Sequence, residues 1–212
     1  MSDWLGFAVF GSLTLAAATM PSTLTLLLLP TLAHEGLMAV SFLLRDPPRR
    51  TLNGVVPCLA AYGASFWLLL FIQAAVMFRP EWLAASANDA LRGAGVLLWM
   101  NGAVLGLWPL WYLRRAFSLE PVARGLVTRG PYRFARHPIY AGYLVQYLGM
   151  WLVCPTLPFA IAIAAWVVMM LTRVRFEERV LSAAHPAYAE YRQRVGRFAS
   201  VPWASRYTSF RV

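Results

Sequence analysis

The longest uncharged segment of the chain, residues 139–172, contains no Asp, Glu, Lys, Arg or His. As one helix its 34 residues would be about 51 Å long, whereas the hydrocarbon core of a membrane is about 30 Å thick. Pro155 and Pro158 lie in the middle of the segment and form a turn signal. The sequence therefore predicts a helical hairpin, with helices at roughly 139–153 and 158–180, whose second helix projects beyond the membrane.

Two further uncharged segments, 55–78 and 93–113, are each long enough to cross a membrane once. Of the 212 residues, 59% are hydrophobic and only 13% are charged, about half the charged share of a soluble domain. The two cysteines, Cys58 and Cys154, have no metal-binding spacing, so we expect small core residues and no metal site. This composition predicts an all-α integral membrane protein with a single domain over residues 1–212.

The N-terminal segment 4–44 allows two interpretations. A turn in its middle would give helices near 4–20 and 23–44, and therefore about six membrane helices in all, which we favour. The alternative is one kinked helix followed by a short amphipathic piece, which gives five. His34 and Glu35 are the only ionisable residues of the segment. In the first interpretation they lie inside a membrane helix, where ionisable residues are candidates for function, and in the alternative they are loop residues.

The arginines are distributed unequally between the two predicted sides of the membrane. All 19 basic residues are Arg, and the net charge is +10. The predicted spans place 17 of them on one side and leave only Arg79 and Arg92 on the other. This bias predicts that the arginine-rich side is cytoplasmic, and we expect a multi-pass protein of a prokaryotic inner membrane. The arginines cluster between apolar segments, so nucleic acid is not an expected partner. The N-terminus lacks the basic region of a cleaved signal peptide, so we expect none.

Two polar clusters flank the uncharged segment. The string Arg136-His137-Pro138 precedes it, and Glu177 and Glu178 follow it closely. A hairpin returns both clusters to the same membrane face, so the sequence predicts that they form one site. Pro138 suits the first position of a helix, and a helix N-terminus favours anions. The backbone before it should be irregular, because proline biases the preceding residue away from the helical conformation.

Other side chains near these clusters have two possible roles each. Tyr140, Tyr143 and Tyr147 recur at helical spacing and should line one face, either as part of a site or as an aromatic belt at the membrane interface. Glu177 and Glu178 can be a salt-bridged helix end, or carboxylates that accept hydrogen bonds from a ribose. These residues by themselves do not decide between the alternatives.

The C-terminal part of the chain, 126 to about 202, resembles the isoprenylcysteine carboxyl methyltransferase family and the related phospholipid methyltransferases. The resemblance rests on residues 126–142, LVTRGPYRFARHPIYAG, on the hydrophobic hairpin, on EERVL at 177–181 and on YAEYRQRV at 188–195, in this order and spacing. It implies an integral membrane methyltransferase that uses S-adenosylmethionine, releases S-adenosylhomocysteine and takes a lipophilic acceptor from the bilayer. Residues 1–113 would supply N-terminal membrane helices, and 114–212 the catalytic region.

The resemblance also implies roles for individual residues. Catalytic or anion-binding roles fall on Arg136, Arg173 and Glu178. Cofactor contacts fall on Tyr132, His137, Pro138, Tyr140, Tyr143, Glu177 and Glu178.

The sequence does not decide the chemical class of the methyl acceptor. We expect most an isoprenylcysteine-like carboxylate; a phospholipid amine or a small lipophilic acid or thiol are alternatives. A carboxylate is already a nucleophile, whereas an amine must first lose a proton and needs a base. Membrane lipids are the only other partners expected, and no obligate protein partner is inferred. Rival functions are an NADPH-dependent membrane reductase and a non-enzymatic scaffold whose arginines hold anionic lipid.

Overall fold

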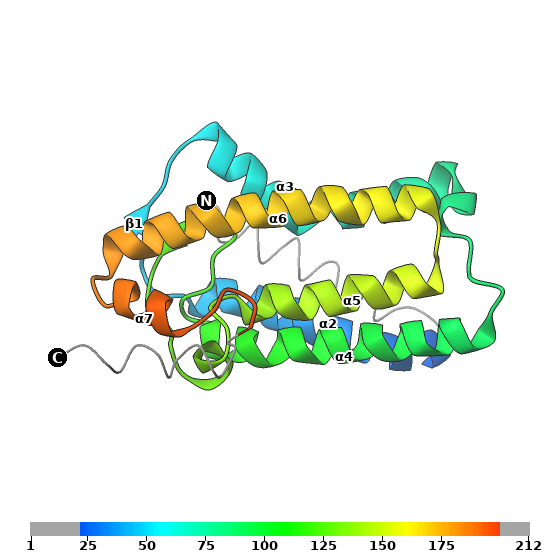
Figure 1. Cartoon of the computed structure of the whole chain (residues 1–212), viewed down its shortest axis with the longest axis horizontal. Helices are drawn as coiled ribbons and strands as arrows, with labels where there is room; N and C mark the ends of the chain where they lie inside the picture. Colours follow the sequence, from blue (N-terminus) through cyan, green and yellow to red (C-terminus); the bar gives the residue numbers. More distant parts are fainter. Residues whose placement is uncertain (1–21, 200–212) are drawn as a thin grey trace.

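The computed structural model describes residues 22–199 as a bundle of long helices (Figure 1). Its helices are α2 (Ser22–Leu44), α3 (Val55–Phe78), α4 (Asp89–Leu113), α5 (Pro138–Val153), α6 (Leu157–Ala184) and the short α7 (Tyr188–Arg194). Two short 3-10 helices, η1 (Pro80–Leu83) and η2 (Gly130–Arg133), lie in the connections. The predicted all-α membrane bundle is confirmed. Among the described residues, α3, α4 and α6 are long and apolar enough to span a membrane, whereas α5 has only 16 residues.

The helix boundaries follow the predicted ones closely. The hairpin is present as α5 and α6, and α6 ends at Ala184, four residues later than expected. Helix α4 begins at Asp89, four residues earlier than expected, because the Asn88 side chain caps it by accepting a hydrogen bond from the Leu91 backbone N–H at 3.0 Å. Helix α2 is continuous over Ser22–Leu44, so no separate short piece follows a break within these residues, as the alternative had expected. The helix predicted at 4–20 lies outside the described residues, and the number of six spans stays a prediction.

The long helices form two layers. Helices α3 and α6 pack side by side in one layer, and α2, α4 and α5 form the other (Figure 1). The closest pair is α4 and α5, whose backbones approach each other at glycines. A Cβ atom at Gly102 would lie 2.3 Å from the Gln146 backbone nitrogen, and one at Gly149 would lie 2.3 Å from the Trp99 nitrogen. Small residues at such an interface allow the close backbone approach by which membrane helices associate.

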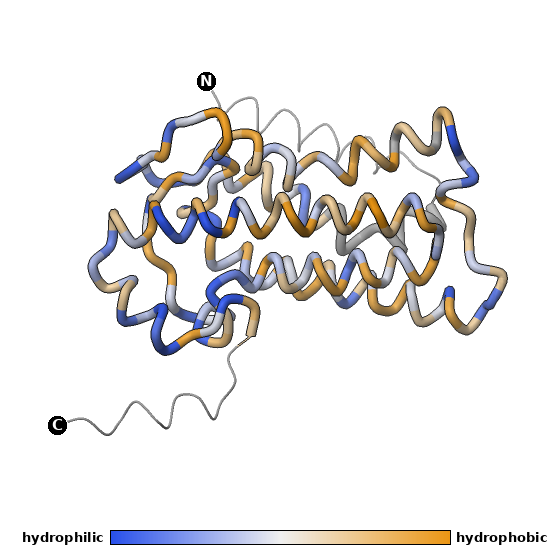
Figure 2. The backbone as a smooth tube through the Cα atoms, turned by 45° about the horizontal axis from the view of Figure 1, so that its top comes forward, coloured by the Kyte–Doolittle hydropathy of each residue, from blue (hydrophilic) through white to orange (hydrophobic). Residues whose placement is uncertain are grey.

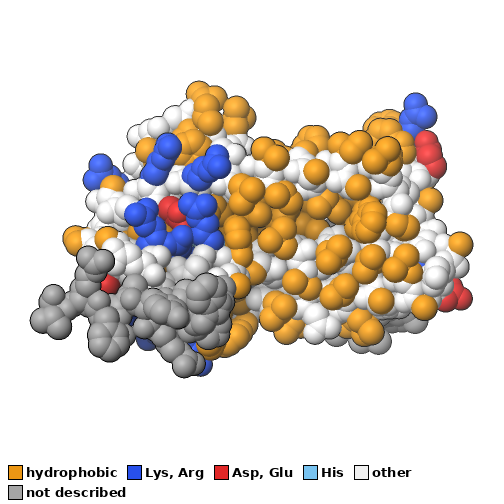
Figure 3. Space-filling view, in the orientation of Figure 1, with side chains coloured by type: hydrophobic (Ala, Val, Ile, Leu, Met, Phe, Trp, Pro, Cys, Tyr) orange, Lys and Arg blue, Asp and Glu red, His pale blue; other side chains and the backbone are white. Residues whose placement is uncertain are grey.

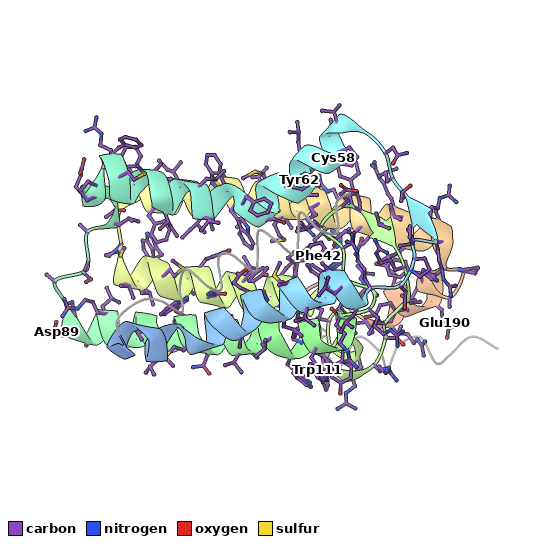
Figure 4. All side chains as sticks on the ribbon, turned by 180° about the vertical axis from the view of Figure 1, so that it is seen from behind. Phe42, Cys58, Tyr62, Asp89, Trp111 and Glu190 are labelled. Atoms are coloured by element: carbon purple, nitrogen blue, oxygen red, sulfur yellow. The ribbon has the colours of Figure 1, made fainter. Side chains whose placement is uncertain are left out.

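Polar residues gather at one end of the bundle, which we call the arginine-rich end (Figures 2 and 3). It is formed by the segments 45–54, 114–137 and 173–199. Asp89 marks the opposite end of the bundle and Glu190 the arginine-rich end (Figure 4). On the face shown in Figure 3, apolar side chains cover most of the helical surface between the two ends, as expected for a surface that faces lipid.

A two-stranded ladder joins the two polar loops at the arginine-rich end. Strand β1 (Arg50–Thr51) pairs antiparallel with β2 (Val122–Ala123), with Arg50 opposite Ala123. The Arg115 guanidinium also lies 3.3 Å from the Asp46 carboxylate. Loops that are far apart in the sequence thus lie side by side, as the predicted placement of their arginines on one side requires. The ladder itself was not predicted, because two residues per strand leave no periodic signal in the sequence.

Candidate active site

A cavity of about 190 Å³ lies between α2, α3, α5, α6 and the loop 114–137. Both predicted polar clusters contribute to its wall, as do two segments without a predicted role. Its polar lining residues are His34, Glu35, Ser65, Ser118, Glu120, Arg124, Tyr132, Arg136, His137, Tyr140, Tyr143, Gln146, Tyr147, Arg173, Glu177, Tyr188 and Tyr191. The apolar part of the wall includes Met38, Phe117 and Ile139.

The first cluster is held by backbone contacts to the C-terminal segment. Helix α5 begins at Pro138 with His137 as its N-cap, and η2 precedes it, so the predicted irregular backbone is present. The backbone N–H groups of Arg136 and His137 donate to the carbonyls of Gly196 and Arg197 at 2.9 and 2.8 Å. The segment after α7 therefore lies along the Arg-His-Pro string and fixes its position.

Glu178 holds three cationic or polar side chains together. Its carboxylate lies 2.9 Å from the Arg136 Nη2, 3.4 Å from the His137 Nε2 and 3.0 Å from the Arg197 Nη2. The side chains of Arg136 and Glu178 are only 8% and 7% exposed, whereas that of Arg197 is 46% exposed. The hydrogen bonds to Glu178 raise the pKa of Arg197 above its ordinary value. Glu178 is thus a buried carboxylate with two guanidinium groups and one imidazole as its partners.

Glu177, one residue earlier on α6, has a different environment. Its Oε1 accepts hydrogen bonds from the Tyr140 hydroxyl and the Arg173 Nε, both at 2.8 Å. Its Oε2 lies 3.7 Å from the His137 Nδ1, too far for a hydrogen bond. Because Glu177 also lines the cavity, this second oxygen can accept a hydrogen bond from a ligand.

Arg173 is buried and already engaged within the protein. Besides the bond to Glu177, it donates to Ser65 Oγ at 2.8 Å, to the Ala61 carbonyl at 3.3 Å and to the Ser118 carbonyl at 3.1 Å. These bonds use four of the five N–H groups that a guanidinium has. Its position joins α3, α6 and the loop after α4, so we infer that Arg173 mainly positions Glu177 and has little capacity left for an anionic ligand.

The tyrosines predicted to share a face of α5 all line the cavity. The ring of Tyr147 packs edge-on against buried Trp166 at 4.6 Å between centroids. The Tyr143 hydroxyl lies 3.2 Å from the Nε2 of His34, which comes from α2. This contact places His34 inside a long helix and beside the site, as the favoured interpretation of the N-terminal segment allows.

Most of the residues with an implied role line the cavity, and two do not. Pro138 and Glu178 are absent from the wall, although both lie next to residues that form it. For Glu178, this location favours positioning of Arg136 and His137 over direct contact with a ligand. The cavity residues with an implied role are Tyr132, Arg136, His137, Tyr140, Tyr143, Arg173 and Glu177; their roles in binding stay predictions.

Sequence reasoning missed several residues of the wall, among them two tyrosines and an arginine. Tyr188 and Tyr191 belong to the string that carries the resemblance, and Arg124 lies in the loop next to β2. Burial raises the pKa of Tyr191 to about 12 and the pKa of Tyr132 well above its ordinary value, so both phenols are protonated donors at neutral pH. The Tyr191 hydroxyl donates to the Tyr132 carbonyl at 2.5 Å. Nothing in the sequence marks Arg124, because only the β1–β2 ladder directs it into the cavity.

Several buried polar atoms of the wall have no hydrogen-bond partner within residues 22–199. They are Arg124 Nε, Tyr132 Oη, Arg136 Nε, Glu35 Oε2 and Tyr188 Oη. A buried polar atom without a partner costs about 1–3 kcal/mol, so such a concentration in one cavity indicates a binding site for a polar ligand. Over the same residues, no group of three or more His, Cys, Asp or Glu side chains is arranged to hold a metal ion.

Comparison with known proteins finds matches to part of the chain. Residues 91–187 match the model of the phospholipid methyltransferase family. The chain is also 29% identical over 133 residues to the cobalt-zinc-cadmium resistance protein CzcN of Cupriavidus metallidurans, a match that covers 62% of this chain and 59% of that protein. It is 29% identical over 132 residues to the nickel-cobalt-cadmium resistance protein NccN of Alcaligenes xylosoxydans xylosoxydans, covering 62% and 58%. The matches therefore span less than two thirds of either relative.

Proposed function

We propose that this chain is an S-adenosylmethionine-dependent methyltransferase that acts on a lipophilic acceptor from the membrane, because residues 91–187 match the model of the phospholipid methyltransferase family. The main observation behind the proposal is a single cavity that is lined by residues of both polar clusters. Several buried polar atoms in its wall have no partner in the described part of the protein. A scaffold that only holds anionic lipid at its surface has no use for such an enclosed polar site.

The side chains of the wall fit the functional groups of the cofactor. S-adenosylmethionine carries a carboxylate, an amine, a ribose diol and an adenine. Guanidinium groups bind carboxylates well, and Arg124 and Arg136 each have a buried Nε available. The free Oε2 of Glu177 is suited to a ribose hydroxyl. The phenols of Tyr132 and Tyr188 are further donors without a partner among the described residues.

The residues of the site would promote methyl transfer mainly by positioning and by excluding water. Bound S-adenosylmethionine supplies a methyl group on a positively charged sulfur. The ring of Tyr140, which already lies 5.7 Å from the Arg173 guanidinium, can also stabilise a second cation by its π face. Glu178 keeps Arg136 and His137 in place. Apolar residues such as Phe117 exclude water from the wall, and a dry, pre-oriented site lowers the barrier of a displacement reaction.

The acceptor of this proposed reaction is a lipophilic molecule that reaches the cavity from the bilayer. The sequence resemblance favours an isoprenylcysteine-like carboxylate, with a phospholipid amine or a small lipophilic acid or thiol as alternatives. The names of the two relatives refer to metal resistance of those proteins and do not select among these acceptors.

Binding of S-adenosylhomocysteine tests the proposal most directly. We expect calorimetry on the protein in lipid nanodiscs to detect binding, and His137→Ala to weaken it at least about 10-fold, which corresponds to the loss of about 1.4 kcal/mol. His185→Ala is a matched control, because His185 is also buried but does not line the cavity. Absence of binding up to millimolar concentration would refute the proposal. An equal loss in both variants would refute the location of the site.

The role of Arg124 can be tested with a smaller ligand. If Arg124 binds the carboxylate of the amino-acid moiety, Arg124→Met should weaken the binding of S-adenosylhomocysteine. The same variant should leave binding of methylthioadenosine, which lacks that moiety, nearly unchanged. Equal weakening of the two ligands would show that Arg124 acts elsewhere.

A further inference from the structure

The end of the cavity between α2 and α5 carries polar groups to which the proposed function assigns no contact with the cofactor. His34 and Glu35 come from α2, and Gln146 and Tyr147 from α5; all four line the cavity. Tyr143 joins the two helices through the 3.2 Å contact between its hydroxyl and the His34 Nε2. We call these five residues the inner cluster.

The inner cluster lies at membrane depth. Glu35 precedes the end of α2 at Leu44 by two and a half helical turns, which corresponds to about 14 Å. Tyr147 lies about 15 Å along α5 from His137 by the same rise per residue. Both residues are therefore about half a hydrocarbon thickness away from the arginine-rich end. A molecule dissolved in the bilayer can present a reactive group at this depth, whereas the charged cofactor contacts lie nearer the arginine-rich end.

Glu35 is the unusual member of the cluster. Its Oε2 is buried and has no hydrogen-bond partner within the described part of the chain. An ionisable side chain at this depth is costly and normally has a function. Arg173 reaches the same cavity, but its donors are directed to Glu177, Ser65 and backbone carbonyls. Glu35 thus lines the cavity with a carboxylate oxygen that no described residue binds, which leaves this oxygen available to a ligand.

We infer that the inner cluster is the acceptor subsite and that it takes a nucleophile that carries a proton, such as a lipophilic amine or thiol, and not a carboxylate. The inference rests on the proposed function. The proton on the acceptor heteroatom passes to Glu35, and the heteroatom lone pair forms the bond to the methyl carbon. The methyl–sulfur bond of the donor breaks and leaves its electron pair on the sulfur. A carboxylate acceptor would have no proton to give and would be repelled by Glu35.

Glu35→Gln separates this role from a structural one. The test uses membranes that contain the full chain, methyl-labelled S-adenosylmethionine, and dodecylamine, dodecanethiol and dodecanoate as long-chain probes. Labelled methyl esters release methanol in alkali, whereas N-methyl and S-methyl products retain the label. We expect alkali-stable label, and a loss of at least about 100-fold in Glu35→Gln, the usual contribution of a general base. Glu35→Asp keeps the carboxylate and should recover part of the rate.

Two controls make the outcome decisive. Glu81→Gln removes a carboxylate whose side chain is 60% exposed and lies in η1, and it should leave transfer unchanged. S-adenosylhomocysteine should bind Glu35→Gln within about 3-fold of the unsubstituted chain, which is under 1 kcal/mol.

Several results would overturn the inference. The first two are a product that releases its label in alkali, as a methyl ester does, and full activity of Glu35→Gln. The other two are loss of S-adenosylhomocysteine binding in Glu35→Gln, and an unsubstituted chain that binds the cofactor but transfers no label to any lipid or probe. Absence of both cofactor binding and transfer in the unsubstituted chain would instead refute the proposed function.

Discussion

Replacing Glu178 with glutamine should loosen the arginine-rich end without disturbing the membrane helices. Glutamine has nearly the same shape but no charge, so the variant leaves the buried Arg136 guanidinium beside a neutral group. Removing one partner of a buried ion pair costs about 3–5 kcal/mol. We expect the lower end of this range, because Arg136 Nη1 keeps its 3.0 Å bond to the Arg192 carbonyl. The pair with Arg197 adds less than about 1 kcal/mol, since Arg197 is 46% exposed and screened by water.

The loss should appear first in the C-terminal segment, which the backbone bonds from Arg136 and His137 hold in place. A cost of about 3 kcal/mol corresponds to a rise of roughly 150-fold in the population of the opened segment. Trypsin cleavage after Arg194 and Arg197, followed by mass spectrometry of the protein in nanodiscs, measures that population. The cleavage rate should therefore rise by about two orders of magnitude, while the circular dichroism of the membrane helices stays unchanged.

Glu190→Gln is the matched control for this experiment. Glu190 also pairs with an arginine, at 3.4 Å, but the two side chains are 70% and 65% exposed, so the variant should change the cleavage rate very little. If Glu178→Gln and Glu190→Gln were cleaved at the same rate, the buried carboxylate would not hold the segment, and the reasoning from burial would be wrong.

Three further predictions concern packing and the cavity. Gly102→Val should lower the free energy of unfolding by several kcal/mol, because its Cβ would lie 2.3 Å from a backbone nitrogen of α5. Gly93→Val should cost less than about 1 kcal/mol, because no atom lies within 4 Å of the new Cβ. Differential scanning fluorimetry compares the melting temperatures of the two variants, and equal effects would contradict the close packing. Tyr140→Phe removes the 2.8 Å hydrogen bond to Glu177, so calorimetry should show S-adenosylhomocysteine binding about 5–30-fold more weakly. An unchanged affinity would mean that the orientation of Glu177 does not matter for binding. Tyr132→Phe should leave the melting temperature unchanged or raise it, because the Tyr132 hydroxyl is buried without a partner in the described part of the chain. The same variant should lower the affinity for S-adenosylhomocysteine. A large fall in melting temperature would instead reveal that the hydroxyl makes a structural hydrogen bond.

Much of the fold could be predicted because membrane helices leave strong local signals. The length of an uncharged segment and the position of prolines depend only on neighbours in the sequence, so α3 matches its predicted range and the hairpin helices differ by a few residues. The β1–β2 ladder left no such signal, since its two residue pairs are 73 and 71 positions apart in the sequence.

The site was predicted less completely than the fold, because the direction of a side chain depends on its partners. Arg136 and Arg173 were both candidates for an anionic ligand, but the structure engages most donors of Arg173 with Glu177, Ser65 and carbonyls. Arg124 was not a candidate, although it lines the cavity with a buried Nε that has no partner among residues 22–199. Composition and spacing carry no information on which donors are already used.

The sequence by itself determined that the chain is a helical membrane protein, that a hairpin joins two polar clusters, and which short strings resemble a methyltransferase. These properties follow from hydrophobicity, proline and local spacing. Only the tertiary structure decided which member of each cluster faces the cavity. Glu177 and Glu178 are adjacent on α6 and point about 100° apart, so only Glu177 lines the cavity and Glu178 binds Arg136 and His137. Glu35 likewise lines the cavity only because α2 packs against α4 and reaches α5 through the His34–Tyr143 contact, which joins residues about a hundred positions apart.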